Sequence, residues 1–195
     1  MIEGPRGSGK TTLTQEFFKL NRNPRIKHYK FSLSDYVKKF EIGSKEEEKS
    51  LHYFSISNIL TILEISGTFL KDLNVVFDRS IFSAYVWSIY QDRLPKKRLM
   101  SEFDKILSSE IYRDCKLIYV TKSDPDFKIS RDKADVFSQF EDYGAEKRVY
   151  DEVLGHFKSL TDNPNSGNEY YEFQNDFNQE SIISFNKLLT GILDK

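Results

Sequence analysis

The chain has 195 residues, a length that suits one domain with a sizeable hydrophobic core. Its 29 Lys and Arg residues nearly balance 30 Asp and Glu residues, so a net charge of −1 gives no basic excess that would indicate nucleic-acid binding. One cysteine excludes an intrachain disulfide, no apolar run approaches the roughly 18 residues of a membrane span, and no secretory signal precedes the first motif, so we expect a cytoplasmic protein.

The first motif of the chain is G-x-x-x-x-G-K-[ST], which runs from Gly4 to Thr11 and is typical of a phosphate-binding loop. Glycines let backbone N–H groups turn toward an anion with no Cβ in the way. The strand before the loop is short, with only Met1, Ile2 and Glu3. We expect the donor nucleotide, ATP, to be bound by Gly4, Pro5, Arg6, Gly7, Ser8, Gly9, Lys10, Thr11 and Thr12.

Two side chains of this loop have distinct predicted roles. Lys10 carries the charge that reaches the β- and γ-phosphates, and the Thr11 hydroxyl is a predicted Mg²⁺ ligand. A helix predicted from about Lys10 to Leu20 points its positive end at the same anion.

Strand-like and helix-like segments alternate after the loop, and strands separated by helices predict a parallel sheet covered on both faces. The helix predicted over 51–70 is apolar around much of its surface and should be largely buried. The charged run 45–49 before it indicates a solvated loop or a helix start. Strands are expected at 26–31, 74–78, 116–120 and 170–173, and helices from 34, at 51–70 and 81–91, around 103–111, at 137–160 and around 182–192.

Asp78 ends an apolar strand, and Arg79 follows it directly. A P-loop protein commonly keeps its Mg²⁺-organising carboxylate at such a position, which makes Asp78 the second predicted metal ligand. Arg79 would point into the crevice at the carboxyl edge of the sheet, where a guanidinium can hold an acceptor. The alternative for Asp78 is an ordinary acidic residue at a strand end.

A polar segment with a second group of cations follows the strand at 116–120. Phosphoryl transfer needs positive charge beside the migrating group, and a closing segment, or lid, at about 122–137 could supply it through Lys128, Arg131 and Lys133. The alternative is a solvated loop, because the same stretch is rich in aspartate.

Four stretches of the chain resemble a known group of kinases, two of them closely. Residues 3–12 resemble the thymidylate kinase loop E-G-x-D-G-x-G-K-[ST]-T, and residues 78–83 resemble that family's D-R-[YF]-x-x-S. Continued to Tyr85, the second stretch also resembles the E-R-S-x-x-S-x-R-Y of deoxynucleoside kinases. Residues 51–55 look like the thymidylate kinase helix whose phenylalanine stacks on thymine, and residues 30–32 lie where that family has R-F-P or R-E-P.

The resemblance implies one P-loop α/β domain over residues 1–195, a three-layer sandwich with a five-stranded parallel sheet in the order 2-3-1-4-5. It implies that Phe31 and Phe54 bind the acceptor together with Arg79. It also implies that Lys10, Arg79 and Arg131 are catalytic, and that the protein could form a homodimer.

The sequence departs from these families in the acceptor region. Arg6 replaces a loop aspartate that thymidylate kinases hold near the nucleotide sugar, and Asn58 stands where some members place a base-reading arginine. Arg6 either contacts an anionic acceptor or points to solvent. No E-x-x-x-x-W follows the second strand, where deoxynucleoside kinases keep their general base, and the nearest carboxylate is Asp35.

These observations predict transfer of the ATP γ-phosphoryl group to a nucleoside monophosphate, with thymidylate first, because a monophosphate needs no strong general base. The alternatives are a deoxynucleoside kinase that acts on the 5′-hydroxyl and a P-loop nucleotide-binding protein that is not a kinase.

Overall fold

The computed structural model describes residues 1–30, 45–69, 73–126, 142–162 and 166–194. Strands and helices alternate along these ranges, as predicted. The strands are β1 (Ile2–Glu3), β2 (Ile26–Lys30), β3 (Asn74–Asp78), β4 (Lys116–Lys122) and β5 (Glu169–Asn175). The helices are α1 (Lys10–Leu20), α3 (Lys45–Phe69), α4 (Ile81–Tyr90), α5 (Lys96–Leu107), α6 (Tyr143–Thr161) and α7 (Gln179–Leu193), with a 3-10 turn at Glu110–Tyr112.

The five strands form one parallel sheet in the order β2-β3-β1-β4-β5, which confirms the predicted fold class. The shortest strand, β1, lies at the centre, where Ile2 is paired with Asp78 of β3 and Ile118 of β4. Because all strands run the same way, the loops that follow β1, β3 and β4 meet at one edge. The phosphate-binding motif and the Asp78-Arg79 pair therefore lie at the same edge of the sheet.

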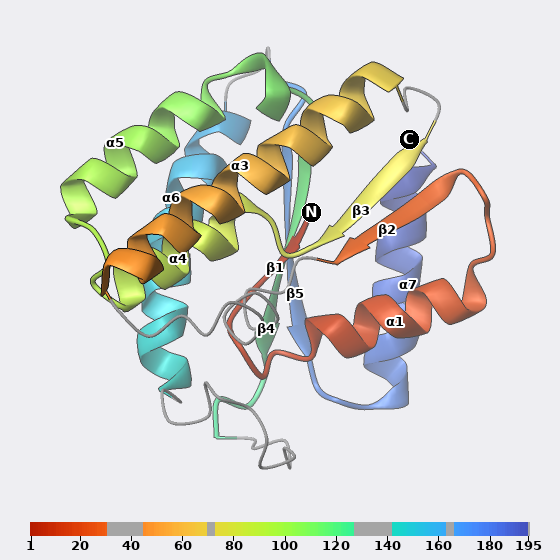
Figure 1. Cartoon of the computed structure of the whole chain (residues 1–195). Helices are drawn as coiled ribbons and strands as arrows, with labels where there is room; N and C mark the ends of the chain where they lie inside the picture. The colour runs from red at the N-terminus through yellow and green to blue at the C-terminus, as the bar shows by residue number, and fades with distance from the viewer. Residues whose placement is uncertain (31–44, 70–72, 127–141, 163–165, 195) are drawn as a thin grey trace.

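Helices cover both faces of the sheet, α1 and α7 on one side and α3, α4, α5 and α6 on the other (Figure 1). On the α1 side, Leu13 and Phe17 lie one helical turn apart and share an apolar cluster with Val76, Val120 and Phe185. This spacing at i and i+4 places both side chains on the face of α1 that meets the sheet.

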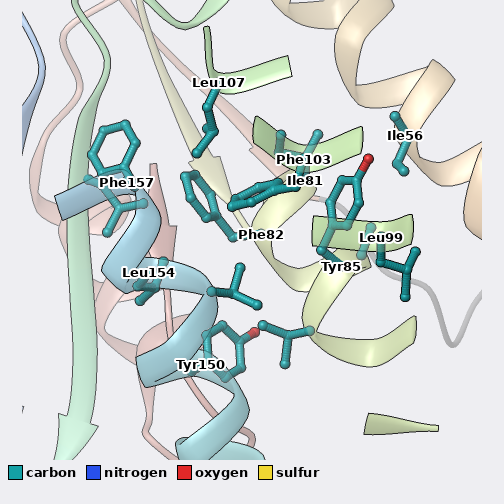
Figure 2. Close-up of a cluster of buried hydrophobic side chains, with 14 of the residues drawn as sticks. Ile56, Ile81, Phe82, Tyr85, Leu99, Phe103, Leu107, Tyr150, Leu154 and Phe157 are labelled. Carbon is teal, nitrogen blue, oxygen red and sulfur yellow. The ribbon is translucent and has the colours of Figure 1, made fainter. Parts of the chain in front are cut away.

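The opposite face holds an aromatic cluster, shown in Figure 2. Phe82 is fully buried and meets Phe103, Tyr112 and Phe157 edge to face, with ring centroids 5.3, 6.4 and 5.4 Å away. Edge-to-face pairs favour rigid packing because the positive ring edge meets a negative ring face. This cluster fixes α4 against α5 and α6, and only Ser80, the N-cap of α4, separates this helix from the Asp78-Arg79 pair.

The longest helix, α3, differs from its prediction in two ways. It begins at Lys45 rather than Leu51, because the charged run before residue 50 consists of strong helix formers. The expectation that it is largely buried is wrong, since Tyr53 and Phe54 are 41% and 44% exposed while Leu51 and Ile59 pack inward. Among the described residues, no helix is both long enough and apolar enough to cross a membrane.

Two other helices have boundaries that the apolar spacing did not predict. Helix α5 begins after Pro95 rather than near Phe103, and Ile111, which we assigned to it, lies in the separate 3-10 turn. Helix α6 begins at Tyr143, where the Asp142 carboxylate accepts the Ala145 N–H at 2.9 Å as an N-cap. The start predicted near 137 and the short helix predicted from 34 lie outside the described residues.

Candidate active site

The loop between β1 and α1 has the backbone that its glycines require. Gly4 has φ 151°, and a Cβ at this position would collide with the carbonyl oxygen of Val120. Gly9 has φ 81° and is the N-cap of α1, with the Phe177 ring 2.9 Å from where its Cβ would stand. Any larger residue would disturb both positions, so the glycines of the motif are structural requirements of this loop.

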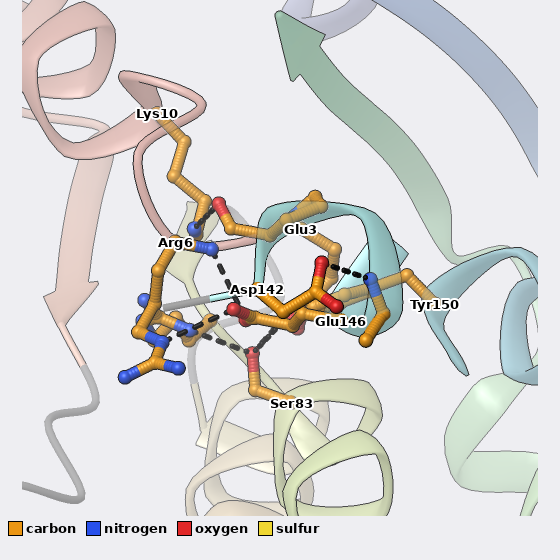
Figure 3. A network of polar contacts seen from close by, with 10 residues as sticks. Glu3, Arg6, Lys10, Ser83, Asp142, Glu146 and Tyr150 are labelled. Atoms are coloured by element: carbon orange, nitrogen blue, oxygen red, sulfur yellow. Dashed lines mark hydrogen bonds and ion pairs between the residues drawn. The ribbon is translucent and has the colours of Figure 1, made fainter. Parts of the chain in front are cut away.

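Lys10 lies across the mouth of this loop, as Figure 3 shows. Its ammonium group donates a hydrogen bond to the Pro5 carbonyl oxygen at 3.0 Å, and the residue is only 3% exposed. Burial, followed by repulsion from Arg79, lowers the pKa of Lys10 to about 7, although nearby carboxylates oppose the shift. A phosphate group at the loop would replace the carbonyl as the partner of this cation.

Asp78 ends β3 and is 1% exposed. Neither carboxylate oxygen has a hydrogen-bond partner among the described residues, which is costly for a buried carboxylate. The described residues also hold no group of three or more His, Cys, Asp and Glu that could bind a metal ion by itself. One unpaired carboxylate beside a phosphate loop fits Mg²⁺, which usually binds one or two protein carboxylates together with substrate phosphates.

Arg79 occupies a strained turn between β3 and α4. Its φ is 73°, which is uncommon for a residue with a Cβ, and its N–H donates to the Ile2 carbonyl oxygen at 3.1 Å. The guanidinium donates to Ser83 Oγ at 3.4 Å. Burial lowers the pKa of Arg79, but acidic neighbours, with Tyr150 and Glu146 first, outweigh burial and raise it, so the side chain stays a cation.

Arg6 is held by a residue that the sequence did not indicate. Its backbone N–H and its Nε donate to the two carboxylate oxygens of Glu146 at 3.0 and 3.1 Å (Figure 3). The guanidinium carbon lies 4.3 Å from the centre of the Trp87 ring, and the side chain is 10% exposed. The alternative in which Arg6 points to solvent is therefore wrong. The guanidinium charge is already balanced by Glu146, which is 2% exposed.

Glu146 and Asn175 could not be found by motif. Glu146 lies 140 residues from Arg6 in the chain, and its place in the first turn of α6 is known only from the structure, because the sequence predicted this helix to begin near residue 137. Asn175, at the end of β5, donates to the Ser8 carbonyl oxygen at 2.9 Å and accepts the Phe177 N–H at 2.9 Å. The loop between β5 and α7 thus supports the phosphate loop from the side of α1.

The residues predicted to bind the acceptor are less fully placed. Phe54 is exposed on α3, and Asn58 of the same helix accepts a 2.8 Å hydrogen bond from the Tyr29 hydroxyl of β2. Thr11 is half-buried in the first turn of α1. Phe31, the three cations Lys128, Arg131 and Lys133, and most of the predicted lid lie outside the described residues, so their roles stay predictions.

A cavity of about 220 Å³ lies at the opposite end of the sheet, lined by residues such as Met1, Val75 and Leu193. Its lining includes neither the phosphate loop nor Asp78, Arg79 or Glu146, so it is not part of the candidate site.

Comparison with known proteins shows a similarity of fold and none of sequence family. No protein-family model matches the chain, and no curated protein matches its sequence. Among solved structures, a deoxyadenosine kinase from M. mycoides, with the products dCMP and a flexible dCDP bound, is 15% identical. The match covers 99% of this chain and 97% of the kinase with a TM-score of 0.61. The chain has the fold of this nucleoside kinase. The similarity is one of fold, and the thymidylate kinase resemblance stays a prediction.

Proposed function

We propose that the protein is an ATP-dependent deoxynucleoside kinase, which transfers the γ-phosphoryl group of ATP to the 5′-hydroxyl of a deoxynucleoside. The observation that carries this proposal is the placement of Lys10, Asp78 and Arg79 at one edge of the sheet, beside a glycine loop whose backbone leaves no room for side chains. The fold shared with a deoxyadenosine kinase supports it. The second interpretation of the sequence is thereby favoured over a monophosphate acceptor.

The charge balance of the site supports a neutral acceptor. Among the described residues, the site holds three basic and three acidic side chains. The basic residues are Arg6, Lys10 and Arg79, and the acidic residues are Glu3, Asp78 and Glu146. Arg6 is already paired with Glu146, and ATP would engage Lys10. Of these three cations in the described part of the chain, Arg79 would remain for the acceptor, which is little charge for a dianionic monophosphate but adequate for the hydroxyl groups of a sugar.

On the donor side, the loop amides and Lys10 would hold the phosphates. Thr11 and Asp78 would hold Mg²⁺, which when bound neutralises charge that develops on the phosphate oxygens. Cations from the predicted lid, with Arg131 foremost, would approach the migrating group. In this arrangement the protein supplies position and charge rather than covalent chemistry.

On the acceptor side, Arg79 would orient the sugar, and Phe54 of α3 and Phe31 offer aromatic rings for the base. The 5′-oxygen forms its bond to the γ-phosphorus as the bond to the bridging oxygen of ADP breaks, and the hydroxyl proton passes to a base. Asp35, the carboxylate that the sequence suggested for this base, lies outside the described residues.

The experiment is a panel of ADP-release assays with MgATP and, in turn, the four deoxynucleosides, thymidylate and no acceptor, each repeated with Lys10→Met. We expect ADP release that depends on a deoxynucleoside and is lost in the variant. Release that depends on thymidylate alone would instead establish a monophosphate kinase. Equal release without any acceptor would leave an ATPase and overturn both kinase hypotheses.

A further inference from the structure

Glu3 is the most deeply enclosed carboxylate of the site, with 0% of the residue exposed. One of its oxygens accepts the backbone N–H of Ser80, and the other accepts the Ser83 hydroxyl at 2.6 Å. Both donors belong to the first turn of α4 or the residue that caps it. No ion pair to Glu3 is found within the described residues, so hydrogen bonds rather than a direct cation compensate most of its burial.

A second helix contributes to the same arrangement. The Tyr150 hydroxyl of α6 lies 2.9 Å from Ser83 Oγ and 3.5 Å from the second Glu3 oxygen (Figure 3). Because the Ser83 proton is given to Glu3, the Tyr150 hydroxyl is the donor in this group, toward Ser83 Oγ at 2.9 Å and the second Glu3 oxygen at 3.5 Å. Ser83 Oγ thus receives Tyr150 from one side and the Arg79 guanidinium, at 3.4 Å, from the other.

Arg79 needs such support because its backbone is unfavourable. A φ of 73° costs free energy for a residue with a Cβ, and the turn persists only if its surroundings hold it. Its own N–H is fixed by Ile2 of β1, and the next N–H, that of Ser80, is fixed by Glu3. Two consecutive amides of the turn are therefore bound by two consecutive residues of β1.

From this geometry we infer that Glu3 is a positioning residue, which acts through Ser83 and Tyr150 to hold Arg79 in the conformation that receives the acceptor. The inference rests on the proposed function. Glu3 is fully enclosed and would touch neither ATP nor the acceptor itself. A carboxylate is suited to this place because it accepts from both donors of α4 at once, at the positive end of the helix.

The buried charge has a further consequence for its neighbours. Burial raises the pKa of Glu3, while the hydrogen bonds from Ser83 and Ser80 and the nearby cations Arg79 and Lys10 oppose that rise. Removing the charge would therefore also change the field at both cations that handle phosphate and acceptor.

The test compares three variants, Glu3→Gln, Ser83→Ala and Tyr150→Phe, with two matched controls. Tyr112→Phe removes a hydroxyl from another fully buried tyrosine, one that has no hydrogen-bond partner among the described residues. Ser88→Ala removes a buried hydroxyl from the same helix as Ser83, where it contacts His52. Each variant is measured for kcat and for the KM of deoxynucleoside and of ATP, and hydrogen exchange is followed over residues 78–83.

We expect kcat/KM for the deoxynucleoside to fall about tenfold in each of the three variants, as the loss of one buried hydrogen bond allows, while KM for ATP changes less than about twofold. Exchange at residues 79 and 80 should become faster in Glu3→Gln and stay unchanged in the controls. Equal falls of kcat/KM in the controls, or faster exchange with unaltered acceptor kinetics, would overturn the inference and leave Glu3 a residue of the fold.

The exchange measurement also separates this inference from the proposed function. If the wild-type protein shows no turnover that depends on an acceptor, the proposed function fails. Faster exchange of the turn in Glu3→Gln would then still support Glu3 as the residue that positions Arg79. Unchanged exchange would overturn that role whatever the reaction.

Discussion

Two buried regions meet at Tyr150 of α6, and they differ in the chemistry of their side chains. The aromatic cluster around Phe82 is closed by rings, whereas the cluster around Glu3 and Lys10 is closed by charges. Tyr150 belongs to both, with its ring among the apolar side chains and its hydroxyl beside Ser83 (Figures 2 and 3). The border between the regions runs through a single side chain.

The aromatic cluster stabilises the fold, whereas the charged cluster lowers its stability. Burial of Phe82 and Phe103 contributes favourable free energy, since each removes a large apolar surface from water. Burial of Asp78 and Lys10 is unfavourable because both lose hydration and find incomplete partners. Such a cluster is expected where a ligand supplies the missing partners, so substitutions should affect the two regions in opposite ways.

The largest effect should come from Lys10→Met. We expect turnover to fall by about a thousandfold or more, as loss of a charge contact in a preorganised site does. The melting temperature should stay the same or rise, because the variant removes a buried cation. Lys19→Met is the matched control on the same helix, where the side chain is 68% exposed and pairs with Glu16. Unchanged turnover in Lys10→Met would remove the phosphate-loop assignment.

The opposite pattern should follow from Phe103→Ala in the aromatic cluster. Phe103 is fully buried, with ring centroids 5.3 Å from Phe82 and 4.8 Å from Tyr85, and its truncation should lower the free energy of unfolding by about 3–5 kcal/mol. Turnover per folded molecule should be retained well below the melting temperature. Leu20→Ala, at a residue that is 73% exposed, should change stability by less than about 0.5 kcal/mol. Denaturant titration measures both, and equal losses would contradict the assignment of the core.

Asp78→Asn tests the charged region at the predicted metal ligand. We expect kcat at saturating ATP to fall about a hundredfold, with a higher Mg²⁺ concentration needed for half-maximal rate, because the neutral amide is a weaker ligand. Nucleotide binding should change far less, and the fold should be retained by circular dichroism. Unfolding of the variant would instead indicate that Asp78 is a structural residue.

The two regions also differ in how far they could be predicted from the sequence. The strands and the sheet order followed from apolar runs and a family resemblance, and β3 has the predicted bounds, Asn74–Asp78. The phosphate loop was predicted because its function needs glycines at fixed spacing, and Gly4 has a backbone that excludes a Cβ. A motif of this kind can be predicted because its residues are close together in the sequence.

Partners that are distant in the chain could not be predicted in this way. Glu146 neutralises Arg6 from 140 residues away, and nothing in the composition of α6 distinguishes it from Glu152, the other glutamate of this helix. Asn175 supports the loop from β5 by the same kind of remote contact. Helix α3 was expected to be largely buried because its own apolar side chains lie around most of its surface. Which of these side chains are exposed depends on the elements that pack against the helix, and the periodicity of the sequence does not specify those elements.

The Arg6–Glu146 pair offers a smaller and more specific test. Glu146→Gln should lower the free energy of unfolding by about 2 kcal/mol, because it removes the buried charge that pairs with Arg6 and replaces one of the two acceptor oxygens by an NH2 donor. A double-mutant cycle with Arg6→Met isolates the coupling energy. The control cycle uses the exposed pair of Lys96 and Glu152, 2.6 Å apart, whose coupling should be below about 1 kcal/mol. Equal couplings in both cycles would contradict a buried clamp between the loop and α6.

The smallest expected effect is the uptake of a fraction of a proton when ATP binds, and it concerns Lys10, as the first prediction did. Burial and the repulsion of Arg79 lower the pKa of Lys10 to about 7, so at pH 8 most molecules carry it neutral. A bound triphosphate favours the charged form, and ATP binding at pH 8 should therefore take up close to one proton, roughly 0.9, against about half at pH 7. Calorimetry in buffers of different ionisation enthalpy measures this uptake, and Lys10→Met should abolish it.

The free energy of unfolding and the affinity for ATP should change in opposite directions with pH. The unfolded chain keeps Lys10 protonated up to its ordinary pKa near 10.5, so between about pH 7 and 10.5 it binds more protons than the folded protein does. The contribution of Lys10 to stability therefore rises with pH across this window, while ATP affinity falls. The difference between wild type and Lys10→Met isolates this contribution from other titrating groups. If ATP binding takes up no proton at pH 8, or takes up the same amount in Lys10→Met, then Lys10 is not the group that is protonated when phosphate binds. Either result would contradict the proposal that ATP restores the positive charge that burial disfavours at Lys10.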